Sequence, residues 1–147
     1  MEKIKKTVSA TEEDQVSRKL LAWLNTFPNK PVDLIRFEAL PTDTAAMALS
    51  TIQAAYIVKK YILGGYQAEY QFKIIYRISP GNSNDLRLQA DELLNALGDW
   101  ATGKHPDSGD GNRVITLEPT TRSSLFAMYD NGDEDHQILM KLTYEVI

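Results

Sequence analysis

The sequence predicts an α+β fold in which a mainly antiparallel sheet carries two main helices packed on one of its faces. Three observations predict it. Every even-numbered residue from 66 to 78 is apolar, which is the alternation of a long strand with one buried face. Residues 86–100 carry a leucine-rich stripe with helical spacing. The remaining strand-like segments are joined by hairpin signals, so a doubly wound parallel sheet is the weaker alternative.

The composition predicts a single α+β domain covering residues 1–147, with residues 1–10 as a flexible or peripheral N-terminal segment. The chain has 147 residues, of which 43% are hydrophobic, and a chain of this length buries enough surface to fold without a disulfide or a metal ion. It has no cysteine, which excludes thiol nucleophiles and thiolate zinc sites. No apolar stretch approaches the roughly 20 residues that cross a bilayer, so no membrane association is expected.

The first half of the chain predicts one helix and several strands. Thr11 and the three acidic residues after it resemble a helix N-cap and first turn, and Pro28 ends the apolar spacing, so a helix is expected over residues 12–26. Short strands are expected over residues 32–40 and 45–52. The alanine-rich segment 44–63 could instead be a helix ended by glycine, but its β-branched and aromatic residues favour two strands.

A hairpin and a second helix follow. Gly64 and Gly65 predict a tight turn, because both positions tolerate positive φ. The strand 66–78 comes next, and Ser83 or Asn84 then caps a helix that ends at Gly103. Residues 104–112 are expected to form a loop. The last part of the chain predicts strands at 114–117 and 124–129, an acidic turn at 130–135, and a final strand whose even-numbered residues from 138 to 146 share one face.

No catalytic, cofactor-binding or metal-binding residue is predicted. The segment from Gly98 to His105 almost spells a phosphate-binding loop, but His105 replaces the required Ser or Thr and the segment closes a helix where such a loop opens one. The acidic residues between 107 and 135 lack the spacing of a calcium loop, and acidic hairpin turns are expected to be solvated. Both histidines, His105 and His136, are expected on the surface.

Three tyrosines, Tyr66, Tyr70 and Tyr76, share one face of the long strand. They could form a platform for stacking nucleic-acid bases, but a nucleic-acid surface needs a basic field. This chain has 20 acidic against 16 basic residues and a net charge of −4. Packing in the core is therefore the favoured interpretation, and no specific nucleic-acid partner is expected.

The charges are unevenly divided along the chain. Residues 1–77 hold 11 Lys and Arg against 8 Asp and Glu, a net +3, and residues 78–147 hold 5 against 12, a net −7. This division can be accidental, or it can favour head-to-tail contacts between identical copies. On the second interpretation, the candidate subunit-interface residues are Lys59, Lys60, Asp130, Asp133, Glu134 and Asp135.

One long stretch resembles a known group of proteins. Residues 61–77, with the sequence YILGGYQAEYQFKIIYR, are followed by a turn and by a helix that ends in LLNALGDW. These elements resemble the minor capsid and tail-terminator (tail completion) proteins of tailed phages and prophages. That group combines an N-terminal helix, a Y-I-x-G-G turn, a long alternating strand and a helix of A-x-x-L-x-x-L-x-x-W character. The helix motif has slightly different spacing here, in Ala90, Leu93, Leu97 and Trp100.

The resemblance covers about residues 10–147 and implies a structural virion protein, not an enzyme, without a cofactor. Subunits of this group form rings, commonly hexameric, that cap the tail tube at its head-proximal end and offer a surface to the head–tail connector. The implied partners are other copies of the chain, the tail tube and the connector, and the implied location is the virion, after assembly in the bacterial cytoplasm. The alternative is a small α+β enzyme or ligand-binding domain whose site residues are dispersed along the sequence.

Overall fold

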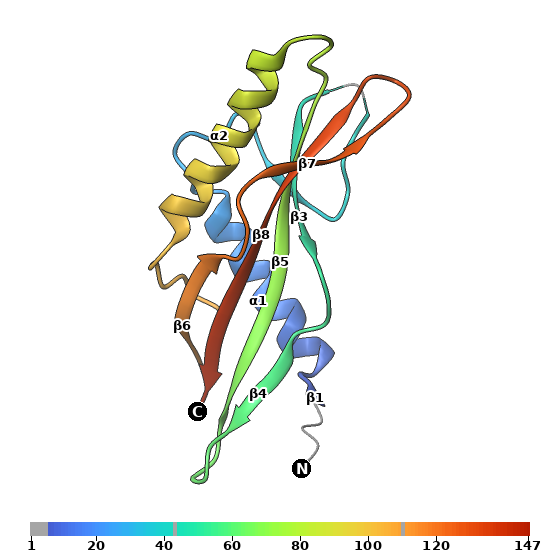
Figure 1. The fold of residues 1–147 in the computed structure, drawn as a ribbon. Coiled ribbons are helices and arrows are strands. Elements are labelled where there is room, and N and C mark those ends of the chain that lie inside the picture. The colour runs from blue at the N-terminus through green and yellow to red at the C-terminus, as the bar shows by residue number, and fades with distance from the viewer. Residues whose placement is uncertain (1–5, 43, 110) are drawn as a thin grey trace.

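The computed structural model describes residues 6–42, 44–109 and 111–147 (Figure 1). Its central feature is a pair of antiparallel strands that match along their whole lengths, from Tyr66 opposite Val146 to Ile78 opposite Glu134. We call this pair the spine. In chain order the elements are β1 (Lys6–Thr7), α1 (Ala10–Leu24), β2 (Ile35–Phe37), β3 (Ala46–Thr51), β4 (Tyr56–Lys60), β5 (Tyr66–Ile78), α2 (Asn84–Ala101), β6 (Asn112–Pro119), β7 (Ser124–Met128) and β8 (Glu134–Val146).

Shorter strands extend the spine on both sides. On the outer edge of β5, β4 pairs beside its first residues and β3 beside its last ones. On the outer edge of β8, β7 pairs beside its first residues and β6 beside its last ones. Two further strands extend the sheet: β1 pairs with β4, and β2 pairs with β3. Among the described strands, β2–β3 is the one parallel pair. The prediction of an α+β fold with a mainly antiparallel sheet is therefore confirmed.

The first helix begins earlier than the sequence predicted. It runs over Ala10–Leu24 because Ser9, not Thr11, is the N-cap, and the Ser9 hydroxyl accepts a hydrogen bond from the Glu12 amide at 3.2 Å. Lys6 and Thr7, expected in a peripheral segment, form β1 against β4. Residues 1–5 of that segment lie outside the described residues.

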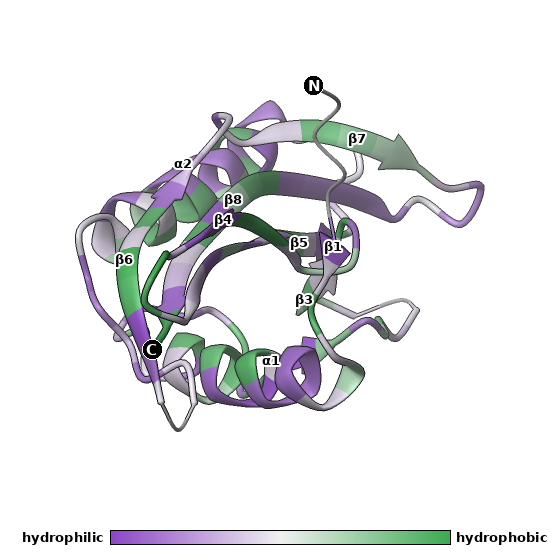
Figure 2. Cartoon of the chain, turned by 90° about the horizontal axis from the view of Figure 1, so that it is seen from below, coloured by the Kyte–Doolittle hydropathy of each residue, from purple (hydrophilic) through white to green (hydrophobic). Residues whose placement is uncertain are grey.

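Both helices pack on the face of the spine that carries the even-numbered residues. Figure 2 shows α1 lying within the curve of the sheet. The helices also contact one another, since the rings of Trp23 and Trp100 stack with centroids 4.4 Å apart. The apolar residues on these faces are buried in one common core or packed against it: Trp23, Leu24, Phe72, Ile74, Tyr76, Leu93 and Leu97. Alternation along the strand and helical spacing thus predicted the buried faces correctly.

A carboxylate in the first turn of α1 ties this helix to the spine. Glu12 accepts hydrogen bonds from the hydroxyls of Tyr66 and Tyr144, which lie on β5 and β8. Tyr70 is fully buried and its hydroxyl hydrogen-bonds to that of Ser17 at 2.8 Å. Tyr76 is packed against the core like Tyr66. The core-packing interpretation of Tyr66, Tyr70 and Tyr76 is confirmed, and their hydroxyls add contacts to the helix.

The β4–β5 hairpin turns where the two glycines predicted it. Both Gly64 and Gly65 have positive φ, at 100° and 84°, and the Tyr61 amide donates to the Gly65 carbonyl at 3.1 Å. The two positions differ in their surroundings. A Cβ on Gly65 would collide with the carbonyl oxygen of Val146, whereas a Cβ on Gly64 would meet open space.

This difference predicts unequal effects of alanine at the two glycines. Gly64→Ala should lower the free energy of unfolding by about 1 kcal/mol, because it adds left-handed strain alone. Gly65→Ala should lower it by more than about 2 kcal/mol, because the collision with the end of β8 is added. Urea unfolding of the two variants measures both values. Equal losses would show that the hairpin does not lie against the end of β8.

The tyrosines predict a loss of stability at alkaline pH. Burial, followed by the hydrogen bond to Glu12, raises the pKa of Tyr66 to about 12. An unfolded tyrosine ionises near 10, so the unfolded chain releases this proton first, and its free energy falls relative to that of the folded protein as the pH rises. The contribution of Tyr66 is therefore complete below about pH 10 and is lost as the pH rises through about 12. Urea midpoints measured from pH 9 to 12 should fall less steeply for Tyr66→Phe than for the wild type; identical slopes would contradict the assignment.

Candidate subunit interface

The predicted basic residues lie at the end of the molecule that carries the β4–β5 hairpin. Lys59 and Lys60 are exposed at the end of β4. The turn that follows them presents Ile62 and Leu63, whose exposed fractions are 101% and 100%. We call these four residues the tip patch. Figure 1 shows the hairpin projecting beyond the rest of the sheet.

The predicted acidic residues lie at the other end, and most of them are not on the surface. Asp130 is exposed in the turn between β7 and β8, but Asp133, Glu134 and Asp135 are each only 2% exposed. The expectation of a solvated acidic turn is therefore wrong for these three residues. Each of them has a partner within the chain, and for Asp133 one partner is the Ser79 hydroxyl, which donates to it at 2.5 Å.

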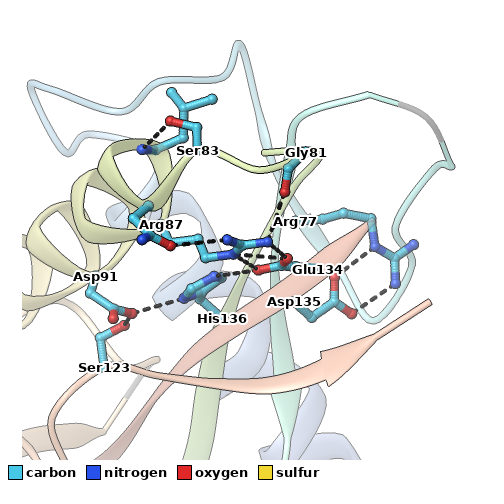
Figure 3. Close-up of polar contacts among 11 residues, drawn as sticks. Arg77, Gly81, Ser83, Arg87, Asp91, Ser123, Glu134, Asp135 and His136 are labelled. Carbon is cyan, nitrogen blue, oxygen red and sulfur yellow. Dashed lines mark hydrogen bonds and ion pairs between the residues drawn. The ribbon is translucent and has the colours of Figure 1, made fainter. Parts of the chain in front are cut away.

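Asp135 is held by two residues on the face of the sheet opposite the helices. Arg77 on β5 donates to both carboxylate oxygens, at 2.7 and 2.8 Å (Figure 3). The Tyr129 hydroxyl donates to the same carboxylate at 2.8 Å, and the Arg77 guanidinium lies 4.8 Å from the centroid of the Tyr129 ring. Such bidentate, charge-assisted bonds have a fixed geometry. They fix the β7–β8 hairpin to β5.

Glu134 and His136 point to the other face, toward α2. Arg87 donates to the Glu134 carboxylate at 2.6 to 3.0 Å and to the Gly81 carbonyl at 2.8 Å (Figure 3). The Arg87 guanidinium lowers the pKa of Glu134, so this buried carboxylate stays ionised. His136 is 2% exposed and its Nδ1 lies 2.9 Å from Asp91. The expectation of a surface histidine is right for His105 and wrong for His136.

This partly buried cluster contains a serine, a histidine and an aspartate, but their order does not suit nucleophilic catalysis. The Ser123 hydroxyl donates to Asp91 at 2.8 Å, and His136 bonds to the same Asp91 oxygen. In a catalytic triad the histidine lies between the serine and the acid and takes the proton from the serine. Here the acid lies between the other two. The cluster instead fastens the start of β8 and the segment before β7 to α2.

A second exposed apolar surface lies on β7. Leu125, Phe126, Met128 and Tyr129 have exposed fractions of 42, 40, 66 and 44%, and together with Asp130 we call them the β7 patch. Within the described residues β7 pairs only with β8, so its other edge is open. Figure 2 shows β7 as an apolar strand at the margin of the sheet. A strand was predicted here from the sequence, but its exposure was not. The signal for exposure is the unbroken apolar run from 125 to 129, because a strand with one buried face alternates between apolar and polar residues.

The tip patch and the β7 patch lie at opposite ends of the spine. Lys60 is opposite Tyr66, the first residue of β5, and Glu134, at the start of β8, is opposite Ile78, the last one. Twelve residue steps of about 3.3 Å separate these two positions, or about 40 Å. The structure therefore brings Lys59 and Lys60 together with exposed apolar residues, and Asp130 with others, far from the first group.

This fold also occurs in a virion. A chain in the solved structure "Virion of native gene transfer agent (GTA) particle" matches this protein with a TM-score of 0.59 at 14% identity. The match covers 88% of this chain and 97% of that chain, which establishes a shared fold. A second solved structure matches with a TM-score of 0.46 at 19% identity, over 95% of this chain and 96% of the other.

No protein-family model matches the sequence, and no curated protein matches it. Among the described residues, neither helix has the length and apolar character that crossing a membrane requires.

The buried ion pair at the acidic turn predicts a large cost for removing its cation. Arg87→Met leaves the 3%-exposed Glu134 side chain without its cation, and should lower the free energy of unfolding by about 3 kcal/mol. The depressed pKa of Glu134 means that the contribution is present at neutral pH and is lost as the pH falls through that pKa. The matched control is Lys19→Met, which removes an ion pair exposed on both sides and should cost less than about 1 kcal/mol. Urea unfolding at pH 7 compares the two; similar losses would mean that the Glu134 pair is not buried.

Proposed function

We propose that this protein is a structural virion subunit of a tailed phage or prophage, of the minor capsid or tail-terminator kind. In this proposal it forms a ring, a hexamer as in the group it resembles, at the head-proximal end of the tail. The observation that carries the proposal is the fold shared with a gene transfer agent virion chain over 97% of that chain. A role that depends on assembly also suits a chain whose two ends are exposed apolar patches.

The exposed apolar residues support association with other proteins. Large exposed apolar side chains that gather together mark interaction surfaces. Exposed ion pairs contribute only about 0.2–1 kcal/mol each, so charge can select an orientation while apolar burial supplies most of the affinity. The tip patch and the β7 patch each combine apolar side chains with exposed charge. Such surfaces suit ring contacts and contacts with the tail tube or the connector.

The described polar sites support a structural role over an enzymatic one. At the acidic turn, Glu134, Asp135 and His136 are buried, and each is bonded to a partly exposed charged residue of the chain. A hollow of about 640 Å³ beside β6 is lined in part by His105, Asp107 and Arg113. There, His105 Nδ1 lies 2.9 Å from the Val114 carbonyl, and Asp107 pairs with Lys19 at 3.2 Å and accepts from the Gly109 amide. Among the described residues that line the hollow, His105 and Asp107 are thus engaged in holding the loop before β6.

Mixing the protein with tail tubes that lack their terminal protein tests this function. The expected result is a ring of density at one end of each tube in electron micrographs, together with reversible association of the isolated protein in sedimentation at high concentration. The ends of tubes incubated with an unrelated acidic protein of similar size serve as the control. Bare tube ends, combined with a protein that sediments as a monomer at all concentrations, would contradict the proposed function.

A further inference from the structure

We propose that the tip patch of one copy docks on the β7 patch of the next copy, and that this contact joins the subunits of the ring. The inference rests on the proposed function for the ring itself and adds which surfaces meet. It assigns Ile62 and Leu63 as the inserted apolar residues. The residues that receive them are Leu125, Phe126, Met128 and Tyr129.

The tip patch is a preformed projection without cover in the chain. Ile62 and Leu63 are completely exposed, although both belong to residue types that are usually buried. Close approach of Gly65 to Val146 holds the hairpin against the end of β8. The last residue, Ile147, is 86% exposed beside it. A rigid apolar projection loses little entropy when it binds, which favours its use as an anchor.

The β7 patch is a rigid surface of the complementary kind. Within the described residues its strand has one open edge, and four large apolar side chains on the strand and directly after it are exposed. Tyr129 is held by its hydrogen bond to Asp135 and by its ring contact with Arg77. The Lys73 ammonium lies 4.9 Å from the centroid of the Phe126 ring. An exposed apolar edge strand pairs readily with another chain unless it is protected. Its support by buried ion pairs keeps the receiving surface in place before contact.

Charge complementarity selects which surfaces of two neighbouring copies meet. Lys59, Lys60 and Asp130 form no ion pair within the described residues, and all three are exposed. Docking tip to β7 brings the two lysines toward Asp130. Pairing two tips would bring four lysines together, and pairing two β7 patches would bring two aspartates together, and such like-charge contacts are unfavourable. The occupant of the β7 patch is therefore the tip of a second copy.

A contact between two different patches of identical chains is heterologous. It leaves one free tip and one free β7 patch on every growing assembly, and it closes into a ring when the rotation per subunit permits. The separation of about 40 Å between the two ends of the spine prevents one chain from satisfying both patches by itself. Each subunit in a ring therefore makes two contacts, one through its tip patch and one through its β7 patch.

Disulfide trapping tests the contact directly, because the chain has no cysteine of its own. A Leu63→Cys variant and a size-tagged Met128→Cys variant are mixed and oxidised, free in solution and on tail tubes. The expected product is the mixed 63–128 dimer, in clear excess over the 63–63 and 128–128 dimers. A Leu34→Cys variant, which is also exposed but lies outside both patches, controls for random collision and should give no excess with either partner. A 63–63 or 128–128 product in excess would overturn the proposal and indicate symmetric pairing.

Charge exchange provides an independent test in chains without cysteine. Lys60→Glu and Asp130→Lys should each weaken association, and the double variant should regain it, because the opposite charges again face one another across the contact. Leu63→Ser should raise the Kd for association about tenfold or more, from lost apolar burial. Unchanged association in all of these variants would overturn the contact while leaving the ring intact. Trapped 63–128 dimers that never bind tail tubes would support the contact and contradict the proposed function.

Discussion

The register between β5 and β8 is the constraint on which the rest of this structure depends. Thirteen residues of each strand pair without a bulge, so the side chains of both strands stay on matched faces over the whole length. One face receives both helices and forms the core. The same unbroken pairing makes the two strands a stiff bar, about 40 Å long between end residues. The spine therefore fixes the positions of the two projections at its ends, the tip hairpin at one end and the β7 hairpin at the other.

The buried charges at the start of β8 stabilise the end of the spine that carries the β7 hairpin. Burying carboxylates is costly, and well-packed apolar residues are often equally or more stabilising than a buried ion pair. Arg77 and Arg87 approach from opposite faces of the sheet and hold successive carboxylates, Asp135 and Glu134. The hairpin that carries β7 is thereby fastened both to β5 and to α2. This arrangement fixes a strand that, in the part of the chain that the structure describes, has a neighbour on only one side, which stability alone would not require.

The regular elements could be predicted from the sequence because their signals are local. Alternation identified both spine strands, the leucine stripe identified α2, and two glycines identified the tip hairpin. The environment of the acidic turn could not be predicted in the same way. The buried carboxylates of Asp135 and Glu134 are paired with arginines that lie 58 and 47 residues away in the sequence. Nothing in a run of acidic residues specifies such distant partners. Strand propensity likewise indicated β7 without showing that its second edge is open, and the candidate interface therefore changed from a mainly charged surface to an apolar one bordered by charge.

The central claim is that a stiff spine presents two preformed patches at a fixed separation, and a distance measured between spin labels tests it most directly. The absence of native cysteine allows labels at Lys60→Cys and Asp130→Cys, one in each patch. We expect one narrow distribution for the isolated protein, centred beyond about 40 Å because Asp130 lies past the end of the spine, and the same distribution when the labelled protein assembles with an excess of unlabelled copies. A broad distribution, or a distance that shifts by many ångströms on assembly, would show that the ends move independently and would contradict the account.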